Sequence, residues 1–257
     1  MKIFKELYQY RELLKTNVKK EIRGKYKGSF LGVLWSFVNP LLMVLVYAIV
    51  FPFILKNGPD NYVLFLIVGI LPWTFFTTCI SQGTYTILAN EGIIKKVYFP
   101  RIILPISVVT SGLINFLISC IIIFVFLIIT GVGFSWYAIF LPIIAIIQYI
   151  LILGMIFITG SINVYIRDAE YIINFFVQML FYATPILYSA DLFPSKLRFL
   201  FNLNPMGAII NGYRDCLYNQ VLPNLQSLFF VFIFSLSILF VGAFVFKKLE
   251  KGFAEEV

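Results

Sequence analysis

Long apolar segments alternate with short polar ones along the chain. A helix that crosses a bilayer needs about 20 mostly apolar residues. Six segments meet this requirement: Leu34–Leu55, Tyr62–Ser81, Ile102–Thr130, Tyr137–Ile162, Tyr171–Ser189 and Leu225–Phe246. The third and fourth are longer than a bilayer requires, so we expect them to tilt, break or project beyond it. The pattern predicts an all-α integral membrane protein with six transmembrane helices in a single membrane domain, residues 1–257.

The segment before the first span has a different period. Residues 3–22 carry an apolar residue at every third or fourth position, with charges between them: Ile3, Leu7, Tyr10, Leu14 and Val18. This is the stripe of an amphipathic helix. Such a helix can lie in the membrane interface with its Lys and Arg near lipid headgroups, or it can pack on the bundle. We favour the first alternative, so residues 1–33 are predicted to be a cytoplasmic interfacial helix and a lead into the first span.

Three glycines join these two elements. Gly24, Gly28 and Gly32 are spaced by four residues, which would place them on one face of a helix. A glycine stripe lets another backbone approach closely. Glycine also weakens a helix by roughly 1 kcal/mol, so a flexible hinge fits equally well.

The composition excludes a soluble protein. The chain is 61% hydrophobic and 12% charged, whereas soluble domains are about 45–50% apolar and about 25% charged. It has no histidine and three scattered cysteines, which argues against a His-based metal site, a proton relay and a disulfide framework. The net charge of +8 would suggest nucleic acid for a soluble protein. In a membrane protein the distribution of the charge explains it first, and we expect no nucleic-acid partner.

Lys and Arg are unequally distributed between the predicted loops. One side of the membrane receives sixteen of them and the other side only four, Lys56, Lys196, Arg198 and Arg214. Basic loops stay in the cytoplasm. We therefore expect a multi-pass protein of the bacterial cytoplasmic (inner) membrane with both termini in the cytoplasm.

Two cytoplasmic segments between spans are candidates for contact with a partner. Residues 83–101, GTYTILANEGIIKKVYFPR, are too long for a tight turn and too apolar for a disordered linker. Residues 163–170 place Arg167, Asp168 and Glu170 together at a membrane edge. Ordinary boundary charge and helix capping explain these three residues equally well.

The external loop, residues 190–224, is not simply polar. Leu197–Leu203 and Met206–Leu217 are apolar but too short to span, and the turn signal Asn204-Pro205 separates them. This predicts a re-entrant helical pair between spans five and six, which is allowed where protein covers the backbone. Arg214 and Asp215 would then be costly and functional if they lie in the membrane, and unremarkable if they are exposed.

The first span contains Pro40 and Pro52 as well as several aromatic residues. Each proline removes a backbone donor and tends to kink a helix. We expect Trp35 to anchor the span at the interface. The hydroxyl of Tyr47, in mid-span, needs a partner and therefore favours the interior. A kinked, aromatic span suits the wall of a pathway.

Several catalytic and binding motifs are absent. The chain has no P-loop G-x-x-x-x-G-K-[ST], no HExxH, no GxSxG and no metal-ligand cluster. Asp and Glu are nearly absent from the spans, which argues against cation-coupled transport and acid–base catalysis. What remains is a channel-like or exporter subunit that takes its energy from elsewhere.

Five segments, in this order, carry a resemblance to a known family: RGKYKGSFLGVLWSFVNPLLMVLVYAIVF, GILPWTFF, IIKKVYFPRIILPIS, NVYIRDAEYI and LNPMGAIINGYRD. The chain resembles the membrane subunits of type-2 ATP-binding-cassette exporters of polysaccharides, which include O-antigen, capsule, rhamnan and teichoic-acid exporters. The resemblance implies a homodimer with two nucleotide-binding ATPase subunits, which would bind ATP and Mg. This chain would hold no cofactor and no active site, and the complex would move a lipid-linked polymer out of the cytoplasm.

The resemblance also implies roles for individual residues. Channel aromatics, which would stack on sugar rings, are Tyr47, Phe51, Phe175, Phe181, Tyr182 and Tyr188. Coupling to the ATPase would involve Asn90, Glu91, Gly92, Lys95, Lys96, Arg167, Asp168 and Glu170. A lipid pyrophosphate would approach Arg23, Lys25, Lys27 and Arg101, since Arg and Lys suit phosphate, although topology alone also explains the lysines. The alternatives are a type-2 exporter of a small lipophilic molecule, such as a drug or lipid, and a non-transport membrane scaffold.

Overall fold

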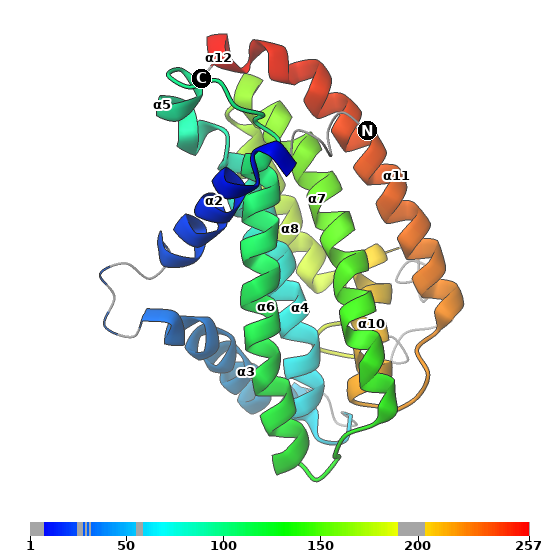
Figure 1. The fold of residues 1–257 in the computed structure, drawn as a ribbon. Helices are drawn as coiled ribbons and strands as arrows, with labels where there is room; N and C mark the ends of the chain where they lie inside the picture. Colours follow the sequence, from blue (N-terminus) through cyan, green and yellow to red (C-terminus); the bar gives the residue numbers. More distant parts are fainter. Residues whose placement is uncertain are drawn as a thin grey trace.

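The computed structural model describes residues 8–24, 28, 30, 32–54, 59–189 and 204–256. Every regular element in these ranges is a helix, and the two ends of the described chain lie at the same end of the bundle (Figure 1). The longer helices are α2 (Arg11–Gly24), α3 (Trp35–Ile54), α4 (Tyr62–Tyr85), α6 (Ile103–Ile129), α7 (Leu141–Tyr165), α8 (Ala169–Tyr182), α10 (Pro205–Leu217) and α11 (Leu225–Leu249). The shorter ones are η1 (Gly32–Leu34), η2 (Leu88–Asn90), α5 (Glu91–Ile94), η3 (Trp136–Phe140), η5 (Glu250–Gly252) and α12 (Phe253–Glu256).

Four helical stretches in the described ranges are long and apolar enough to cross a membrane. They are Tyr62–Tyr85, Ile103–Ile129, Trp136–Tyr165 and Leu225–Glu256. The apolar part of α3, Phe37–Phe51, is shorter. Helix α8 has 14 residues, so it is about 21 Å long against the roughly 30 Å of hydrocarbon in a bilayer. The all-α membrane class is therefore confirmed, whereas six complete spans stay a prediction.

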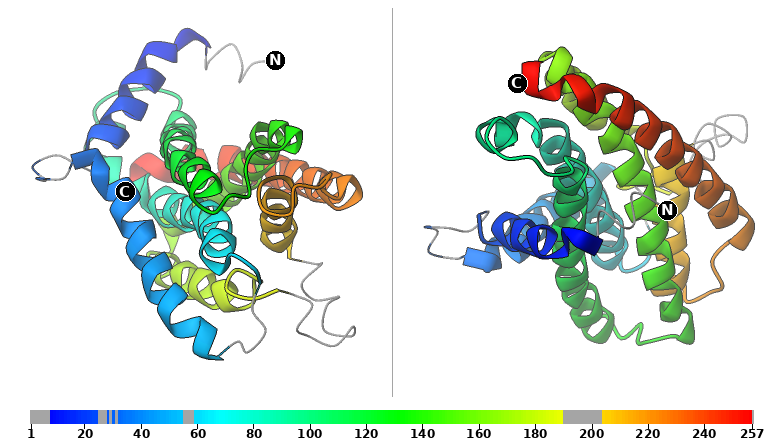
Figure 2. Two further views of the ribbon diagram at one scale, coloured as in Figure 1. Left: turned by 90° about the horizontal axis from the view of Figure 1, so that it is seen from below. Right: turned by 45° about the horizontal axis from the view of Figure 1, so that its top comes forward.

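Helix α4 forms the centre of the bundle. It packs against α3, α6, α7, α8 and α10, and its side chains from Leu64 to Leu71 are all buried. A helix that is apolar on every face belongs inside a bundle. The outer helices instead expose large apolar side chains, for example Phe229, Phe240 and Phe244 of α11. Figure 2 shows α11 at the outside of the bundle against α7.

Two glycines bring the backbones of α7 and α11 together. A Cβ added at Gly242 would lie 2.4 Å from the carbonyl oxygen of Gly154, and one added at Gly154 would lie 2.6 Å from the amide nitrogen of Leu239. Small residues at an interface let membrane helices approach closely. The contact between α7 and α11 therefore depends on the absence of side chains at both positions.

We expect Gly242→Ala to destabilise the protein by about 1–3 kcal/mol, the usual cost of adding a methyl group to a closely packed interface. The change is measured as a lower melting temperature of the purified protein in detergent. Gly92→Ala is the matched control, because a Cβ at Gly92 meets nothing within 4 Å. Equal melting temperatures for the two variants would contradict the close α7–α11 contact.

Helix α2 packs against α6. Of the predicted apolar stripe, Tyr10, Leu14 and Val18 are half-buried, and Ile3 and Leu7 lie outside the described residues. The amphipathic helix is confirmed. It packs on the bundle, which was the alternative that we did not favour from the sequence. Contact of its basic face with lipid stays a prediction.

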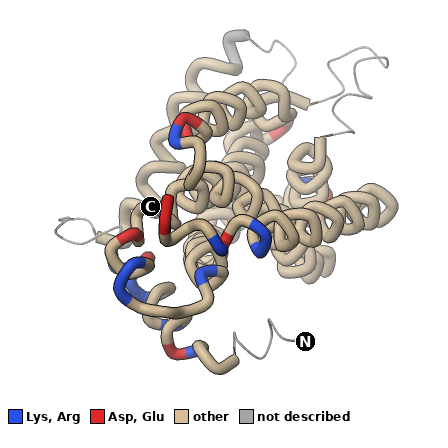
Figure 3. The backbone as a smooth tube through the Cα atoms, turned by 90° about the horizontal axis from the view of Figure 1, so that it is seen from above, with Lys and Arg blue, Asp and Glu red and all other residues tan. Residues whose placement is uncertain are grey.

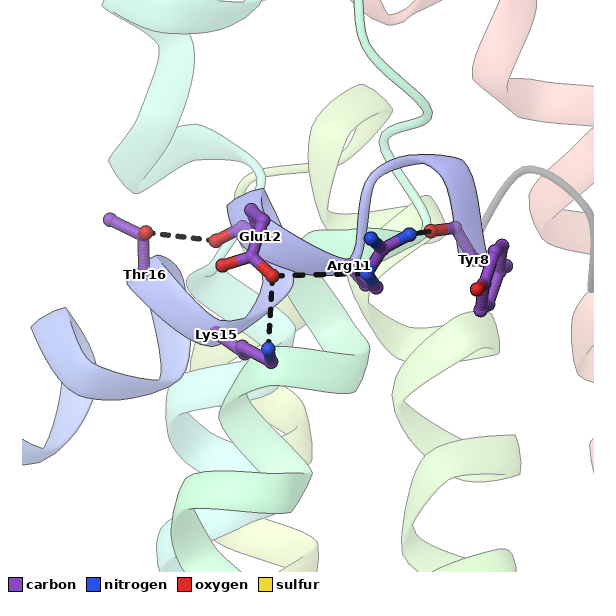
Figure 4. Close-up of polar contacts among 5 residues, drawn as sticks. All are labelled: Tyr8, Arg11, Glu12, Lys15 and Thr16. Atoms are coloured by element: carbon purple, nitrogen blue, oxygen red, sulfur yellow. Dashed lines mark hydrogen bonds and ion pairs between the residues drawn. The ribbon is translucent and has the colours of Figure 1, made fainter.

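The outer face of α2 carries a local network of polar contacts (Figure 4). The Glu12 carboxylate accepts a hydrogen bond of 2.9 Å from Lys15 Nζ, and its backbone oxygen accepts one of 2.8 Å from Thr16 Oγ1. The Arg11 guanidinium lies 4.6 Å from the centre of the Tyr8 ring. The hydrogen bond from Lys15, followed by the positive charge of the same group, lowers the pKa of the Glu12 carboxyl. All five residues are exposed, so the network adds little to stability.

The three glycines after α2 do not form a helical stripe. Helix α2 ends at Gly24, and Gly28 and Gly32 have φ angles of 81° and 52°. These angles are incompatible with a right-handed helix and favour glycine. A Cβ at any of the three would meet nothing within 4 Å. The structure therefore contradicts the close-packed stripe, and the flexible hinge stays a prediction.

Helix α10 is the second member of the predicted re-entrant pair. Pro205 occupies its first turn, and the Asn204 side chain caps it by accepting hydrogen bonds from the amide groups of Met206 and Gly207. The helix inserts among α4, α7 and α11. The first predicted member, Leu197–Leu203, lies outside the described residues, so the pair as a whole stays a prediction.

Candidate functional site

An aromatic cluster joins α3, α4 and α8, and Phe181 is at its centre. The Phe181 ring stacks on Tyr47 with the ring centres 6.1 Å apart. The centre of the Phe181 ring also lies 5.7 Å from that of Trp73 and 5.3 Å from that of Tyr182. Phe181 itself is only 9% exposed, whereas Tyr182 is 71% exposed. The cluster thus anchors α3 to α4 and α8 and presents one ring at the surface.

Two further predicted channel residues extend this cluster. Phe51 meets Tyr47 edge to face, with ring centres 5.8 Å apart. The Tyr188 hydroxyl donates a hydrogen bond of 2.6 Å to the backbone oxygen of Tyr182. The structure therefore brings together five of the six aromatics that the sequence singles out. Their role as a channel wall stays a prediction.

Phe175 lies apart from this cluster, on the exposed face of α8. It pairs edge to face with Phe176, the ring centres 6.1 Å apart. The same face exposes Tyr171, Met179 and Tyr182. We call this face of α8 together with the aromatic cluster the aromatic track.

Residues 183–189, which follow α8, form no regular helix, and Arg214 from α10 caps this break. Its guanidinium donates hydrogen bonds to the backbone oxygens of Pro185 and Ile186, at 2.5 and 2.6 Å. It also lies 3.5 Å from the centre of the Phe65 ring. Arg214 is 4% exposed, which settles the question left open by the sequence: the residue is buried. Backbone carbonyls without helical partners need donors of this kind inside a membrane protein.

Neighbouring side chains complete the cap. The Tyr62 hydroxyl donates a hydrogen bond of 2.8 Å to the Leu187 oxygen, and the Asn204 amide donates one of 2.8 Å to Thr184 Oγ1. Gly69 leaves the space that the guanidinium occupies, because a Cβ there would lie 2.8 Å from an Arg214 nitrogen. Side chains from several helices therefore stabilise the non-helical conformation after α8.

A second buried polar group connects α10 to the bundle centre. Gln148 is fully buried in α7, and its amide donates a hydrogen bond of 2.8 Å to the Pro72 oxygen of α4. Its side-chain oxygen accepts one of 3.2 Å from the Tyr213 hydroxyl. The sequence analysis did not single out Gln148 or Tyr213, although a glutamine inside an apolar segment is a usable signal.

Lys and Arg of α2, the turn after α5, α11 and the turn before α8 gather at the end of the bundle that carries both ends of the described chain (Figure 3). We call this the basic end. Here Asn163, fully buried at the end of α7, holds two segments together. Its amide donates a hydrogen bond of 3.2 Å to the Thr84 oxygen, and its oxygen accepts one of 3.0 Å from the backbone amide of Glu170. The sequence analysis placed Asn163 in a coupling segment without giving it a role.

The predicted coupling residues divide into exposed and inward-facing ones. The exposed ones are Glu91, Gly92, Lys95, Lys96, Arg167 and Asp168. Asn90 is 7% exposed: its amide donates to the Thr86 oxygen at 2.8 Å, and its oxygen accepts from Lys20 Nζ at 3.1 Å. Its side chain therefore braces the segment against α2 and presents little surface to a partner. Glu170 is half-buried at the start of α8.

The predicted phosphate-binding residues lie at separate places. Arg23 is exposed at the end of α2, and Lys25 and Lys27 lie outside the described residues. Arg101 contacts the residues that directly follow α11. Its backbone amide donates a hydrogen bond of 3.1 Å to the Glu250 carboxylate, its guanidinium donates to the Glu250 backbone oxygen, and it lies 6.0 Å from the Phe253 ring centre.

Comparison with known proteins identifies the family. Residues 12–218 match the family model described as ABC-2 type transporter. The chain belongs to the ABC-2 transporter family. This ABC-2 membrane protein is 33% identical, over the whole of both chains, to a Myxococcus xanthus protein named O-antigen export system permease protein RfbA.

Other relatives carry related names. A Klebsiella pneumoniae protein, also named O-antigen export system permease protein RfbA, is 35% identical over 95% of this chain and 94% of its own. An Escherichia coli protein named polysialic acid transport protein KpsM is 22% identical over 91% of this chain and 92% of its own. The ABC-2 membrane protein therefore has the same extent as these relatives.

Proposed function

We propose that this chain is the membrane-spanning subunit of an ATP-driven exporter that moves a lipid-carrier-linked cell-surface polysaccharide, or a teichoic-acid-type polymer, from the cytoplasm across the inner membrane. The observation that carries the proposal is the similarity, over the full length, to relatives named O-antigen export permeases. The aromatic track supports it, because aromatic faces stack on sugar rings without requiring one sugar sequence.

We propose an assembly for this subunit as well. Two copies of this chain would form a homodimer with two nucleotide-binding ATPase subunits, which carry ATP and Mg. The basic end would face the cytoplasm, in agreement with its content of Lys and Arg. The exposed residues of α5 and of the turn at Arg167 and Asp168 are both at this end, so we assign ATPase coupling to them. Arg23 and Arg101 would lie near the approach of the lipid pyrophosphate.

We assign the aromatic track to the wall of the export path. Its exposed members, Phe175 and Tyr182, are available for stacking on a polymer. Tyr47, Phe51 and Phe181 would hold α3 and α8 at the spacing that the path requires. The break capped by Arg214 would lie farther along the same path.

Export should slow when the tyrosine rings are removed. We expect Tyr47→Ala with Tyr182→Ala to lower the rate of polymer export about tenfold, since each ring contributes about 0.5–1.5 kcal/mol of stacking. The readout is surface polymer per unit of time in cells that contain the whole transporter, with the amount of assembled complex measured beside it.

Two control variants separate stacking from other effects. Tyr47→Phe with Tyr182→Phe keeps both rings and should export normally. Phe229→Ala with Phe244→Ala removes two exposed rings from α11 and should leave export unchanged. Normal export by the double alanine variant of Tyr47 and Tyr182 would count against the track, and would favour a scaffold or an exporter of a small lipophilic molecule.

A further inference from the structure

A cavity of about 710 Å³ lies at the basic end, between the start of α2, the segment before α6 and the end of α11. Its volume falls within the range of about 300–1,000 Å³ that ligand sites usually have. The cavity is lined by Arg101 and Ile102, which directly precede α6, and by the last turns of α11, and both helices are long enough to cross a membrane. It therefore lies where a bilayer places its headgroups.

The lining of the cavity is amphipathic. Ile102, Ala243 and Phe246 give it an apolar floor, and Tyr10 and Tyr98 supply aromatic walls. Tyrosine is enriched where headgroups meet hydrocarbon. A ligand that fits this lining has a polar head joined to an apolar body.

The polar side of the cavity is positively charged. Lys247 and Lys251 are one helical turn apart, are exposed, and take part in no ion pair within the part of the chain that the structure describes. The other two charged residues are Arg101 and Glu250, which have opposite sign, and the side chain of each forms a hydrogen bond with the backbone of the other. The net excess of positive charge therefore comes from the two lysines.

We propose that this cavity binds the headgroup of an anionic membrane phospholipid. The phosphate lies between Lys247 and Lys251, and the glycerol with the upper acyl chains lies over Ala243 and Phe246. Basic pockets between helices at the cytoplasmic side of a membrane bind anionic lipid headgroups in this way. The lipid is a resident of the surrounding bilayer and not the exported substrate, so the proposal does not depend on the proposed function.

A bound phospholipid has a structural consequence. The cavity wall includes Gln9 and Tyr10, which lead into α2, and the last turns of α11. These two elements come from opposite ends of the chain. The lipid would contact both of them and would stabilise the fold by ligand linkage.

The test is a titration of the purified full-length chain, freed of lipid in detergent. Native mass spectrometry counts bound phosphatidylglycerol and phosphatidylcholine that have the same acyl chains. We expect the wild-type chain to bind phosphatidylglycerol preferentially. Lys247→Gln with Lys251→Gln should weaken this binding about thirtyfold, since each lysine near a headgroup contributes about fivefold.

Two further variants distinguish a site from general surface charge. Lys19→Gln with Lys248→Gln removes the same charge from exposed positions on α2 and α11 outside the cavity lining, and it should bind phosphatidylglycerol as the wild type does. Ala243→Leu keeps both lysines but places a larger apolar side chain in the cavity, and it should lower the binding of phosphatidylglycerol. All three variants should retain the wild-type melting temperature in lipid-free detergent.

Three results would overturn the proposal. They are equal binding of the two phospholipids by the wild-type chain, equal losses in the cavity and control variants, and displacement of phosphatidylglycerol by an equimolar polyprenyl diphosphate. The last result would assign the cavity to the carrier lipid of the exported polymer. The proposed function would survive each of the first two results, so the two proposals fail separately.

Discussion

Replacing Arg214 by methionine is expected to destabilise the protein by about 2–6 kcal/mol, because two buried carbonyl groups lose their donors at about 1–3 kcal/mol each. The guanidinium reaches Pro185 and Ile186 together and also faces the Phe65 ring. Methionine fills a similar volume and donates no hydrogen bond. The measurement is the melting temperature of the purified protein in detergent, with the exposed residue change Arg23→Met as control.

Arg214→Lys tests the geometry of the cap more finely. Lysine keeps the charge but lacks the planar fork that serves two acceptors at once. We expect the segment after α8 to be released, which a Leu187→Cys change reports, since Leu187 is 4% exposed and its side chain is shielded in the capped state. The rate of labelling of Cys at position 187 by a maleimide should be at least about fivefold higher in the Arg214→Lys protein than in the protein that retains Arg214. This corresponds to a difference near 1 kcal/mol in the free energy of releasing the segment. Equal labelling and an unchanged melting temperature would show that Arg214 does not cap the break.

The second large effect is expected at Asn163, and it rests on the proposed function. Asn163→Leu leaves the Thr84 oxygen and the Glu170 amide without their partner, at about 1–3 kcal/mol each. The segments that present Lys95 and Arg167 are then no longer held to each other through this side chain. We expect the partner subunits to assemble and hydrolyse ATP while polymer export falls at least about tenfold.

The readout is the amount of polymer exported per ATP hydrolysed by the assembled transporter. Asn219→Leu is the matched control, because Asn219 is exposed at the opposite end of the bundle and its side-chain amide donates to the nearby Asp215 carboxylate. A normal ratio in the Asn163→Leu protein would remove this residue from the coupling mechanism. A failure to assemble would contradict the expectation as well, and would make Asn163 a residue of the fold alone.

The long helices could be predicted from the sequence because hydrophobic runs near 20 residues have few other uses. Helices α4, α6, α7 and α11 lie where the apolar segments indicated. The fifth segment was harder, because Tyr171–Ser189 is mostly apolar and yet the helix ends at Tyr182. Pro185 is the local signal for this end, since proline has no backbone donor and disfavours helix at the residue before it. The donor for the freed carbonyl groups, Arg214, is distant in sequence, and no local pattern reveals it.

The candidate site was predictable to the extent that it depended on residue type. Aromatic residues of the first and fifth segments do meet, at Tyr47 and Phe181. Trp73 and Gln148 were missed, since their positions depend on how α4 and α7 rotate against their neighbours. Asn90 was assigned to the surface that contacts the ATPase subunit, although it is buried. The sequence of a loop does not indicate whether a polar side chain points outward or inward.

The glycines fall into two groups that differ in how closely other atoms approach them. Gly154 with Gly242, and Gly83 with Gly160, bring backbones so close that α4, α7 and α11 cannot slide past one another without steric conflict. Gly28 and Gly32 have no such contacts within 4 Å of an added Cβ. Helices α4, α7 and α11 are thus held together by direct contact of their backbones. We expect a force applied to one of them at the basic end to move all three as one unit.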